Sequence, residues 1–122
     1  MSTLKVNTIQ DASGGNSSTA EQIEQGRAKI WCSWNGQGTP SIYDSFNVSS
    51  ITDNSTGDFT VNFSSNMANS NYAYTWASGG LMWNGLANYR TTSTLRCLCM
   101  ARADSYAQDD SDINCIAIFG DQ

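Results

Sequence analysis

The side chains in this chain that could do chemistry are four cysteines and eleven carboxylates, because the sequence contains no histidine. Without histidine, neither a Ser-His-Asp nor a Cys-His arrangement can form, and the usual general base near neutral pH is missing. Catalysis would have to rest on carboxylates, thiols or a bound metal. A glycosidase-type pair needs two carboxylates about 5 to 10 Å apart in a cleft, and Asp44 is the one acid that we expect within a sheet. We therefore predict that the protein is not an enzyme.

The cysteines are spread along the chain, and their spacing favours burial over metal binding. Tetrahedral zinc sites commonly use pairs separated by two residues, because this spacing lets the backbone wrap around the ion. The close pair here is Cys97 and Cys99, whose spacing places both sulfurs on one face of a strand. We expect buried, reduced thiols at Cys32, Cys97, Cys99 and Cys115, with one or more disulfides as the alternative. No metal site and no cofactor is predicted.

Acidic residues gather in the segment before the last apolar run, at Asp104, Asp109, Asp110 and Asp112. Spaced carboxylates can bind calcium, but the glycine and the distal glutamate of an EF-hand loop are absent. We expect a solvated acidic loop, whose carboxylates can pair with arginines such as Arg96 in the same or another subunit.

The charge balance excludes two classes of partner. Six basic residues stand against eleven acidic ones, which gives a net charge of −5. Nucleic acids and anionic membranes are bound by clustered Lys and Arg, so we expect neither as a partner. No apolar run approaches the roughly 18 residues of a membrane span, and the first residues lack the apolar region of a signal peptide. We therefore predict no membrane insertion.

Aromatic side chains are the candidates for recognition. Trp83 lies within a glycine-flanked segment, Gly79–Gly85, that we expect to be a loop. It either packs back onto a sheet or contacts a partner, because aromatic faces stack on sugar rings and asparagine amides both donate and accept hydrogen bonds. The candidate contacts with a host glycan or partner protein are Trp83, Asn84, Tyr89 and Tyr106.

Residues 1–27 read as an arm that lacks a core of its own. Apolar and polar residues alternate over Leu4–Ile9, which predicts a strand, and Asp11–Asn16 predicts a turn with two glycines. A short helix should follow, because Ser18 with Glu21 and Thr19 with Gln22 have capping-box spacing, and it should end near Gly26. Either this arm docks on its own domain or it packs against other subunits. For the second alternative we predict an interface of Leu4, Val6, Ile9, Ala20 and Ile23.

Residues 28–122 alternate with a period of two and predict about seven strands at hairpin spacing. The expected fold is mainly β, an antiparallel β-sandwich or flattened barrel preceded by the strand-turn-helix arm. Its last strand is expected to place Ile113, Cys115, Ala117 and Phe119 on one face.

Several segments resemble tail-fibre-like structural proteins of tailed phages, notably marine and cyanobacterial ones. The segments are Leu4–Asp11 with Ser13–Gly15, Gly26–Trp31 with Trp34–Thr39, and Ser45–Asn54 running into Thr56–Phe63. Met67-Ala68 and Asn71-Tyr72 follow at similar places, so the resemblance spans roughly residues 4–76.

The resemblance implies a virion protein, made in the bacterial cytoplasm and assembled as a homotrimer with other tail or capsid proteins. A fibre-like element in host adhesion is the first expectation. A capsid decoration or cement protein at three-fold sites of the head is the alternative within the class. A stand-alone glycan-binding β-sandwich is the alternative from another class.

Overall fold

A computed structural model gives the fold of the chain and describes residues 1–79, 81–83, 89–100 and 107–122. Within these ranges the chain is mainly β, as predicted. The described residues form ten strands and one short helix, and eight of the strands lie within residues 28–122, where about seven were expected. The bounds are β1 (Thr8–Gln10), β2 (Ser17–Thr19), α1 (Ala20–Gly26), β3 (Ile30–Asn35), β4 (Ser41–Phe46), β5 (Val48–Ser55), β6 (Asp58–Phe63), β7 (Ala73–Ser78), β8 (Leu81–Trp83), β9 (Thr94–Met100) and β10 (Asn114–Phe119). No helix among the described residues combines the length and the apolar character needed to cross a membrane.

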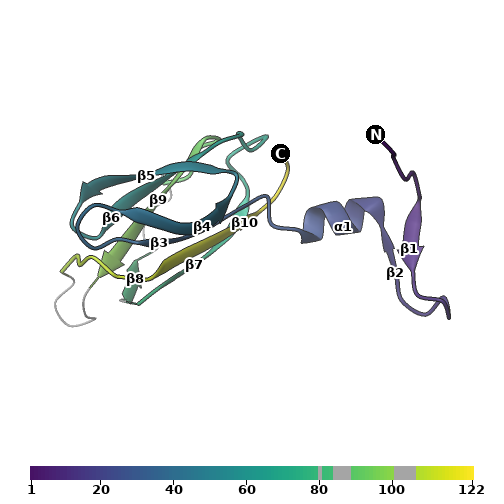
Figure 1. Ribbon diagram of the computed structural model, residues 1–122, viewed down its shortest axis with the longest axis horizontal. Coiled ribbons are helices and arrows are strands. Elements are labelled where there is room, and N and C mark those ends of the chain that lie inside the picture. Colours follow the sequence, from purple (N-terminus) through teal and green to yellow (C-terminus); the bar gives the residue numbers. More distant parts are fainter. Residues whose placement is uncertain (80, 84–88, 101–106) are drawn as a thin grey trace.

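Two antiparallel sheets stack to form a β-sandwich, in the strand orders β4-β3-β10-β7 and β5-β6-β9-β8 (Figure 1). Asn47 turns the chain from β4 into β5, and so from one sheet to the other, at a φ of 57°. In the part of the chain that the structure describes, neither sheet closes on itself. Of the two predicted architectures, the fold is therefore the sandwich and not the barrel.

The core lies between the sheets and follows the predicted alternation in β3, β6 and β9. The inward residues of these strands are almost fully buried: Ile30, Cys32, Trp34, Phe59, Val61, Phe63, Leu95, Cys97 and Cys99. Trp34 lies at the centre, where its ring packs edge-on against Phe59 and Trp76 at centroid distances of 6.2 and 6.4 Å. Burying this apolar area from water is the main term that stabilises the sandwich.

The residues expected to share one face of the last strand do so, and this is the outer face of β10. Ile113 is 53% exposed and Cys115, Ala117 and Phe119 are half-buried, whereas Asn114, Ile116 and Ile118 are buried. Asn114 takes an inward position because its amide is satisfied there. Its Nδ2 donates to the Ser111 carbonyl at 2.9 Å, and its Oδ1 accepts from the Ser78 hydroxyl at 3.0 Å. A buried amide with both partners carries little penalty.

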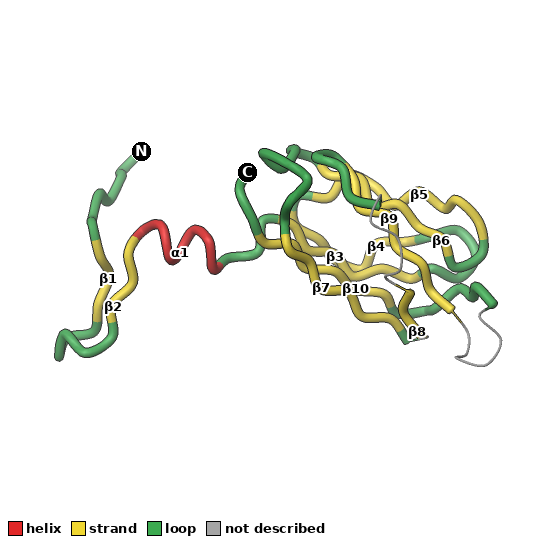
Figure 2. Tube along the Cα trace, turned by 180° about the vertical axis from the view of Figure 1, so that it is seen from behind, coloured by secondary structure: helices red, strands yellow, loops and turns green. Residues whose placement is uncertain are grey.

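The arm, residues 1–27, projects from one end of the sandwich as a hairpin of β1 and β2 followed by α1 (Figure 2). The turn and the helix are confirmed, but the predicted strand over Leu4–Ile9 is wrong in its extent. β1 begins at Thr8, because its pairing partner β2 has three residues before the chain enters α1. Leu4 and Val6 therefore lie ahead of the hairpin.

Candidate functional site

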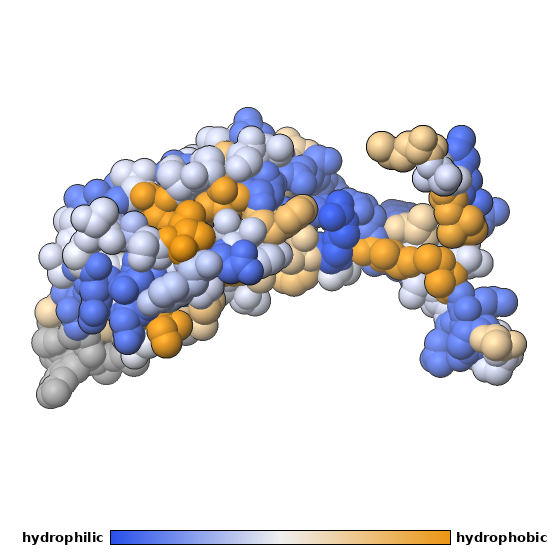
Figure 3. All heavy atoms as spheres, viewed as in Figure 1, coloured by the Kyte–Doolittle hydropathy of each residue, from blue (hydrophilic) through white to orange (hydrophobic). Residues whose placement is uncertain are grey.

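The large apolar side chains of the arm are exposed. The exposed fractions are 82% for Leu4, 56% for Ile9, 43% for Val6 and 41% for Ile23, and Ala20 is exposed as well. No residue of α1, which the structure describes in full, is buried. Figure 3 shows hydrophobic residues in orange along the arm, where the sandwich does not cover them in this view. These apolar side chains of the arm are therefore not packed away on its own domain.

Hydrogen bonds within the arm hold its shape instead. The Asp11 carboxylate accepts from the Ser13 hydroxyl at 2.8 Å, the Gly15 amide at 2.9 Å and the Asn16 side chain at 2.9 Å. These contacts, that of Ser13 first, lower the pKa of Asp11 to about 2. At the start of α1, Thr19 and Gln22 form the predicted capping box, with distances of 3.1 and 2.9 Å.

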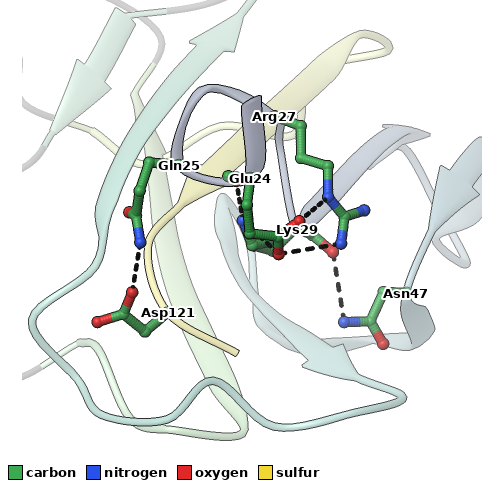
Figure 4. Close-up of polar contacts among 6 residues, drawn as sticks. All are labelled: Glu24, Gln25, Arg27, Lys29, Asn47 and Asp121. Atoms are coloured by element: carbon green, nitrogen blue, oxygen red, sulfur yellow. Dashed lines mark hydrogen bonds and ion pairs between the residues drawn. The ribbon is translucent and has the colours of Figure 1, made fainter. Parts of the chain in front are cut away.

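The junction between arm and sandwich is built around Lys29, which is 1% exposed (Figure 4). Its ammonium donates to the Glu24 backbone carbonyl and lies 3.0 Å from the Glu24 carboxylate. Arg27 pairs with the same carboxylate at 2.7 Å. Arg27 first, and then Lys29, lowers the pKa of Glu24 to about 2. These contacts tie α1 to the sandwich. The positive charge of Lys29 also interacts favourably with the negative, C-terminal end of the helix dipole.

A second contact between the arm and the sandwich lies beside the Glu24–Lys29 contact. The Gln25 amide donates to the Asp121 carboxylate at 2.7 Å, and Asn47 donates to the Lys29 carbonyl at 3.4 Å (Figure 4). An open cavity of about 400 Å³ adjoins this contact, lined in part by Gln25, Phe119 and Asp121. The junction therefore links the arm to the end of β10 as well as to the start of β3.

Of the predicted recognition residues, Asn84 and Tyr106 lie outside the described residues. The backbone of Trp83 lies in β8, paired with Leu98 of β9, so the predicted loop is wrong at this position. Tyr89 is half-buried, and the Arg96 guanidinium lies 4.9 Å from the centroid of its ring. This is a cation–π contact.

Tyr89, which was predicted as a contact residue, and Arg96 belong to a larger surface that the sequence did not predict. We call it the polar face, and it is the outer side of β5, β6 and β9. Asn62 Nδ2 donates to Thr52 Oγ1 at 2.8 Å, and Asn54 Nδ2 donates to Thr60 Oγ1 at 2.9 Å. The remaining polar members of this face are Ser50, Asp58 and Thr94. The signal for it was present in the alternation of hydroxyl and amide residues along β5 and β6.

The ionic contacts differ from those predicted for the acidic segment. Arg96 pairs with Asp58 of the neighbouring strand, and this contact lowers the pKa of Asp58. Asp110 is half-buried and accepts from the Gly57 amide at 2.7 Å, so this part of the segment is packed and not fully solvated. Asp104 lies outside the described residues.

All four cysteines, each within the described residues, are free thiols, as the first of the two predictions had it, but the predicted burial is wrong for Cys115. Burial raises the pKa of Cys32 to about 12, and it raises that of Cys97 as well. Cys115 is the partly exposed one, and its Sγ lies 3.6 Å from the Ser33 hydroxyl. Among the described residues no group of three or more Cys, Asp or Glu gathers closely enough to hold a metal ion.

The described surface therefore offers exposed apolar side chains on an arm and hydrogen-bonding groups on one side of a sandwich. Both are means of binding other molecules. Comparison with protein-family models, with curated proteins and with solved structures found no match in any of the three.

Proposed function

We propose that the chain is a structural protein of a phage virion, a homotrimeric, fibre-like element that is exposed on the particle and takes part in host adhesion. Residues 1–27 join the copies and attach them to other virion proteins, and the sandwich is displayed. The proposal includes no catalytic step, no cofactor and no contact with nucleic acid or membrane. It also draws on the resemblance of residues 4–76 to tail-fibre-like proteins.

The observation that carries the proposal is the exposure of Leu4, Val6, Ile9 and Ile23 on a projecting arm. Fully covering one Ile or Leu stabilises a structure by about 1.5–3 kcal/mol, and the chain itself leaves part of this contribution unused at each of these residues. Three copies around an axis can cover these side chains, as can a larger assembly. An α1 of seven residues also gains from such packing, because isolated helices of this length are marginal in water.

The polar face supports the adhesion part of the proposal. It presents hydroxyl and amide groups beside the Tyr89 ring and the Arg96 guanidinium. Such groups match the hydroxyls of a host glycan or the polar surface of a host protein. A face built in this way is suited to contact with a hydrated partner.

Sedimentation equilibrium of the full chain tests the assembly. The expected mass is three times the 13.2 kDa of one chain. Replacing Ile9 and Ile23 by serine should yield the monomer. The matched control is Ile42→Ser, because Ile42 is exposed to a similar extent, 38% against 41% for Ile23, but lies on the sandwich. A wild-type chain that remains monomeric at all concentrations contradicts the trimer.

Electron microscopy of phage particles with antibody against the sandwich tests the location. Labelled tails support the proposal. Labelled heads would make the protein a decoration protein, and unlabelled particles would remove it from the virion altogether.

A further inference from the structure

The outer side of the β4-β3-β10-β7 sheet differs from the polar face, and we call it the neutral face. The register of the sheet aligns its outward residues in rows across the strands. One row is Phe46, Trp31, Ala117 and Thr75, and the next is Asp44, Ser33, Cys115 and Ala77. Phe119 and Ala73 form a third. Aromatic rings thus stand beside small side chains on a sheet surface.

Much of this face is open to solvent. Trp31 is 36% exposed and Phe46 is 45% exposed, and Ala73, Thr75 and Ala77 of β7 are exposed as well. Among the outward strand residues that the structure describes here, Asp44 is the single charged one, and it lies on the edge strand β4. The polar face, by contrast, carries the Arg96–Asp58 pair and a network of amides and hydroxyls.

We propose that the neutral face packs against neighbouring copies of this chain and turns toward the axis of the assembly. This inference rests on the proposed function and adds to it which side of the sandwich faces inward. The polar face then turns outward.

The neutral face is continuous with the junction to the arm. β3 begins directly after the arm, and β10 ends at the same end of the sandwich (Figure 1). Just beyond β10, the Asp121 carboxylate accepts a hydrogen bond from Gln25 beside the cavity that Phe119 lines. Trp31 and Phe119, at these two strand ends, therefore border the junction. Copies that meet through their arms bring this end of the neutral face close to the same axis.

The area of the neutral face also favours a second copy as its occupant. Strand spacing of about 4.8 Å and a rise of about 3.3 Å per residue give the neutral face a footprint of roughly 400 Å², half of the roughly 800 Å² per partner in a standard interface. The face alone is too small for a stable complex, and it needs a second contact. Another copy supplies both at once, because each copy brings an identical arm and an identical face.

The net charge of the chain also favours contact between copies through the neutral face. The chain has a net charge of −5, so copies repel one another unless they meet where carboxylates are sparse. The neutral face offers such a place. Interfaces between identical subunits are also more apolar than those between transient partners, which fits a face of aromatic and small side chains.

Alkylation of Cys115 by iodoacetamide measures whether the face is covered. Cys115 lies in the middle of the neutral face, whereas Cys32, Cys97 and Cys99 are buried. The alkylation rate of Cys115 therefore reports whether the neutral face is covered. In the assembled full chain we expect alkylation to be slower by about tenfold or more than in the monomeric Ile9→Ser/Ile23→Ser variant. Peptide mass spectrometry confirms the labelled position.

A matched pair of variants measures whether the face contributes to assembly. Thr75 and Thr52 are both exposed threonines on strands, Thr75 on the neutral face and Thr52 on the polar face. Thr75→Lys should raise the dissociation constant of the assembly by about tenfold or more, and Thr52→Lys should leave it within about threefold of wild type. Circular dichroism checks that both variants fold.

The outcomes separate this inference from the proposed function. If the chain assembles but Cys115 reacts as fast as in the monomer, or Thr75→Lys assembles like Thr52→Lys, the neutral face is not an interface between copies. The proposed trimer then stands on the arm alone. If Cys115 becomes protected only when other virion proteins are added, the occupant is a different protein and the inference is wrong. A chain that never assembles contradicts both.

Discussion

The arm and the sandwich treat their apolar side chains in opposite ways. In the sandwich, Trp34, Phe59 and Leu95 are fully buried between two sheets. In the arm, the Asp11 turn and the capping box of α1 are complete, yet Ile9 and Ile23 remain exposed. Local hydrogen bonds can therefore specify the shape of a segment without stabilising it by burial.

The difference shows where stability must come from in each region. A net hydrogen bond contributes about 1 kcal/mol, and the arm closes its turn and caps its helix with a small number of them. The sandwich adds a buried apolar core. We therefore expect substitutions in the sandwich to act on the free energy of unfolding, and substitutions in the arm to act on local order and on assembly.

The sharpest test compares one apolar residue from each region. Phe59→Ala should lower the free energy of unfolding by about 3–5 kcal/mol, because it opens a cavity beside Trp34. Ile23→Ala should change it by less than about 0.5 kcal/mol when the chain is monomeric, because its own chain does not bury Ile23. Chemical denaturation at low protein concentration measures both. A large effect of Ile23→Ala in the monomer would contradict the comparison.

Two glycines with similar backbones extend the comparison. Gly57 has a φ of +66° and Gly14 in the arm a φ of +74°, so a side chain is strained at either position. At Gly57 an added Cβ would also lie 2.6 Å from the Asp109 nitrogen and closer still to the Cys99 carbonyl. At Gly14 the nearest atom is 4.0 Å away.

We expect Gly57→Ala to lower the free energy of unfolding by about 2 kcal/mol or more, because backbone strain and the clash with a packed segment add together. Gly14→Ala should leave the thermal unfolding of the sandwich unchanged and should loosen the hairpin of the arm. Differential scanning calorimetry and amide exchange distinguish the two effects. Equal shifts in unfolding temperature would mean that the arm folds together with the sandwich.

The capping box predicts a smaller, local effect. Thr19→Ala removes the hydroxyl that accepts from the Gln22 amide, and a lost N-cap costs about 1 kcal/mol of helix stability. Amide exchange of α1 should become faster by about fivefold, with exchange in the sandwich unchanged. The control is Thr8→Ala in β1, which should leave exchange in α1 as it is.

The pH dependence of the arm is the smallest effect. The folded arm lowers the pKa of Asp11 from 3.8 to about 2. The ionised Asp11 carboxylate therefore stabilises the turn of the arm fully above pH 3.8, and this stabilisation is lost as the pH falls toward 2. The carboxyl carbon of Asp11, followed by NMR, should titrate near pH 2. Ser13→Ala should raise this midpoint, because the Ser13 hydroxyl is the largest cause of the shift. A midpoint near 3.8 in the wild type would show that the turn is open in solution.

Alternation predicted the strands whose two faces differ most. β6 places apolar residues on one side and polar ones on the other, so the period fixes its inward face. β3 and β9 follow the same pattern with exceptions, because Trp31, Leu98 and Met100 lie on their outer sides. β10 carries apolar residues on both sides, and the period alone does not choose between them. The choice depends on Asn114, whose amide finds Ser78 and Ser111 only in the folded chain.

In the candidate site, too, some features could be predicted from the sequence and others depend on the folded chain. That the arm lacks a core of its own followed from the small number of apolar residues within 1–27, which left open whether the arm docks on the sandwich. The burial of Lys29 did not follow from the sequence, because it depends on the contact that its ammonium makes with Glu24 near the end of α1. The neutral face also escaped the sequence, since it depends on the register of strands that lie far apart along the chain.

The place of β10 has a consequence for biosynthesis. It is the last strand in the chain, yet it lies between β3 and β7 and pairs with both. While the ribosome is still elongating the polypeptide, those two strands have no shared neighbour, and the sheet cannot close until β10 has emerged. Closure of this sheet is therefore expected to be slow, because its decisive pairings join distant stretches of the nascent polypeptide.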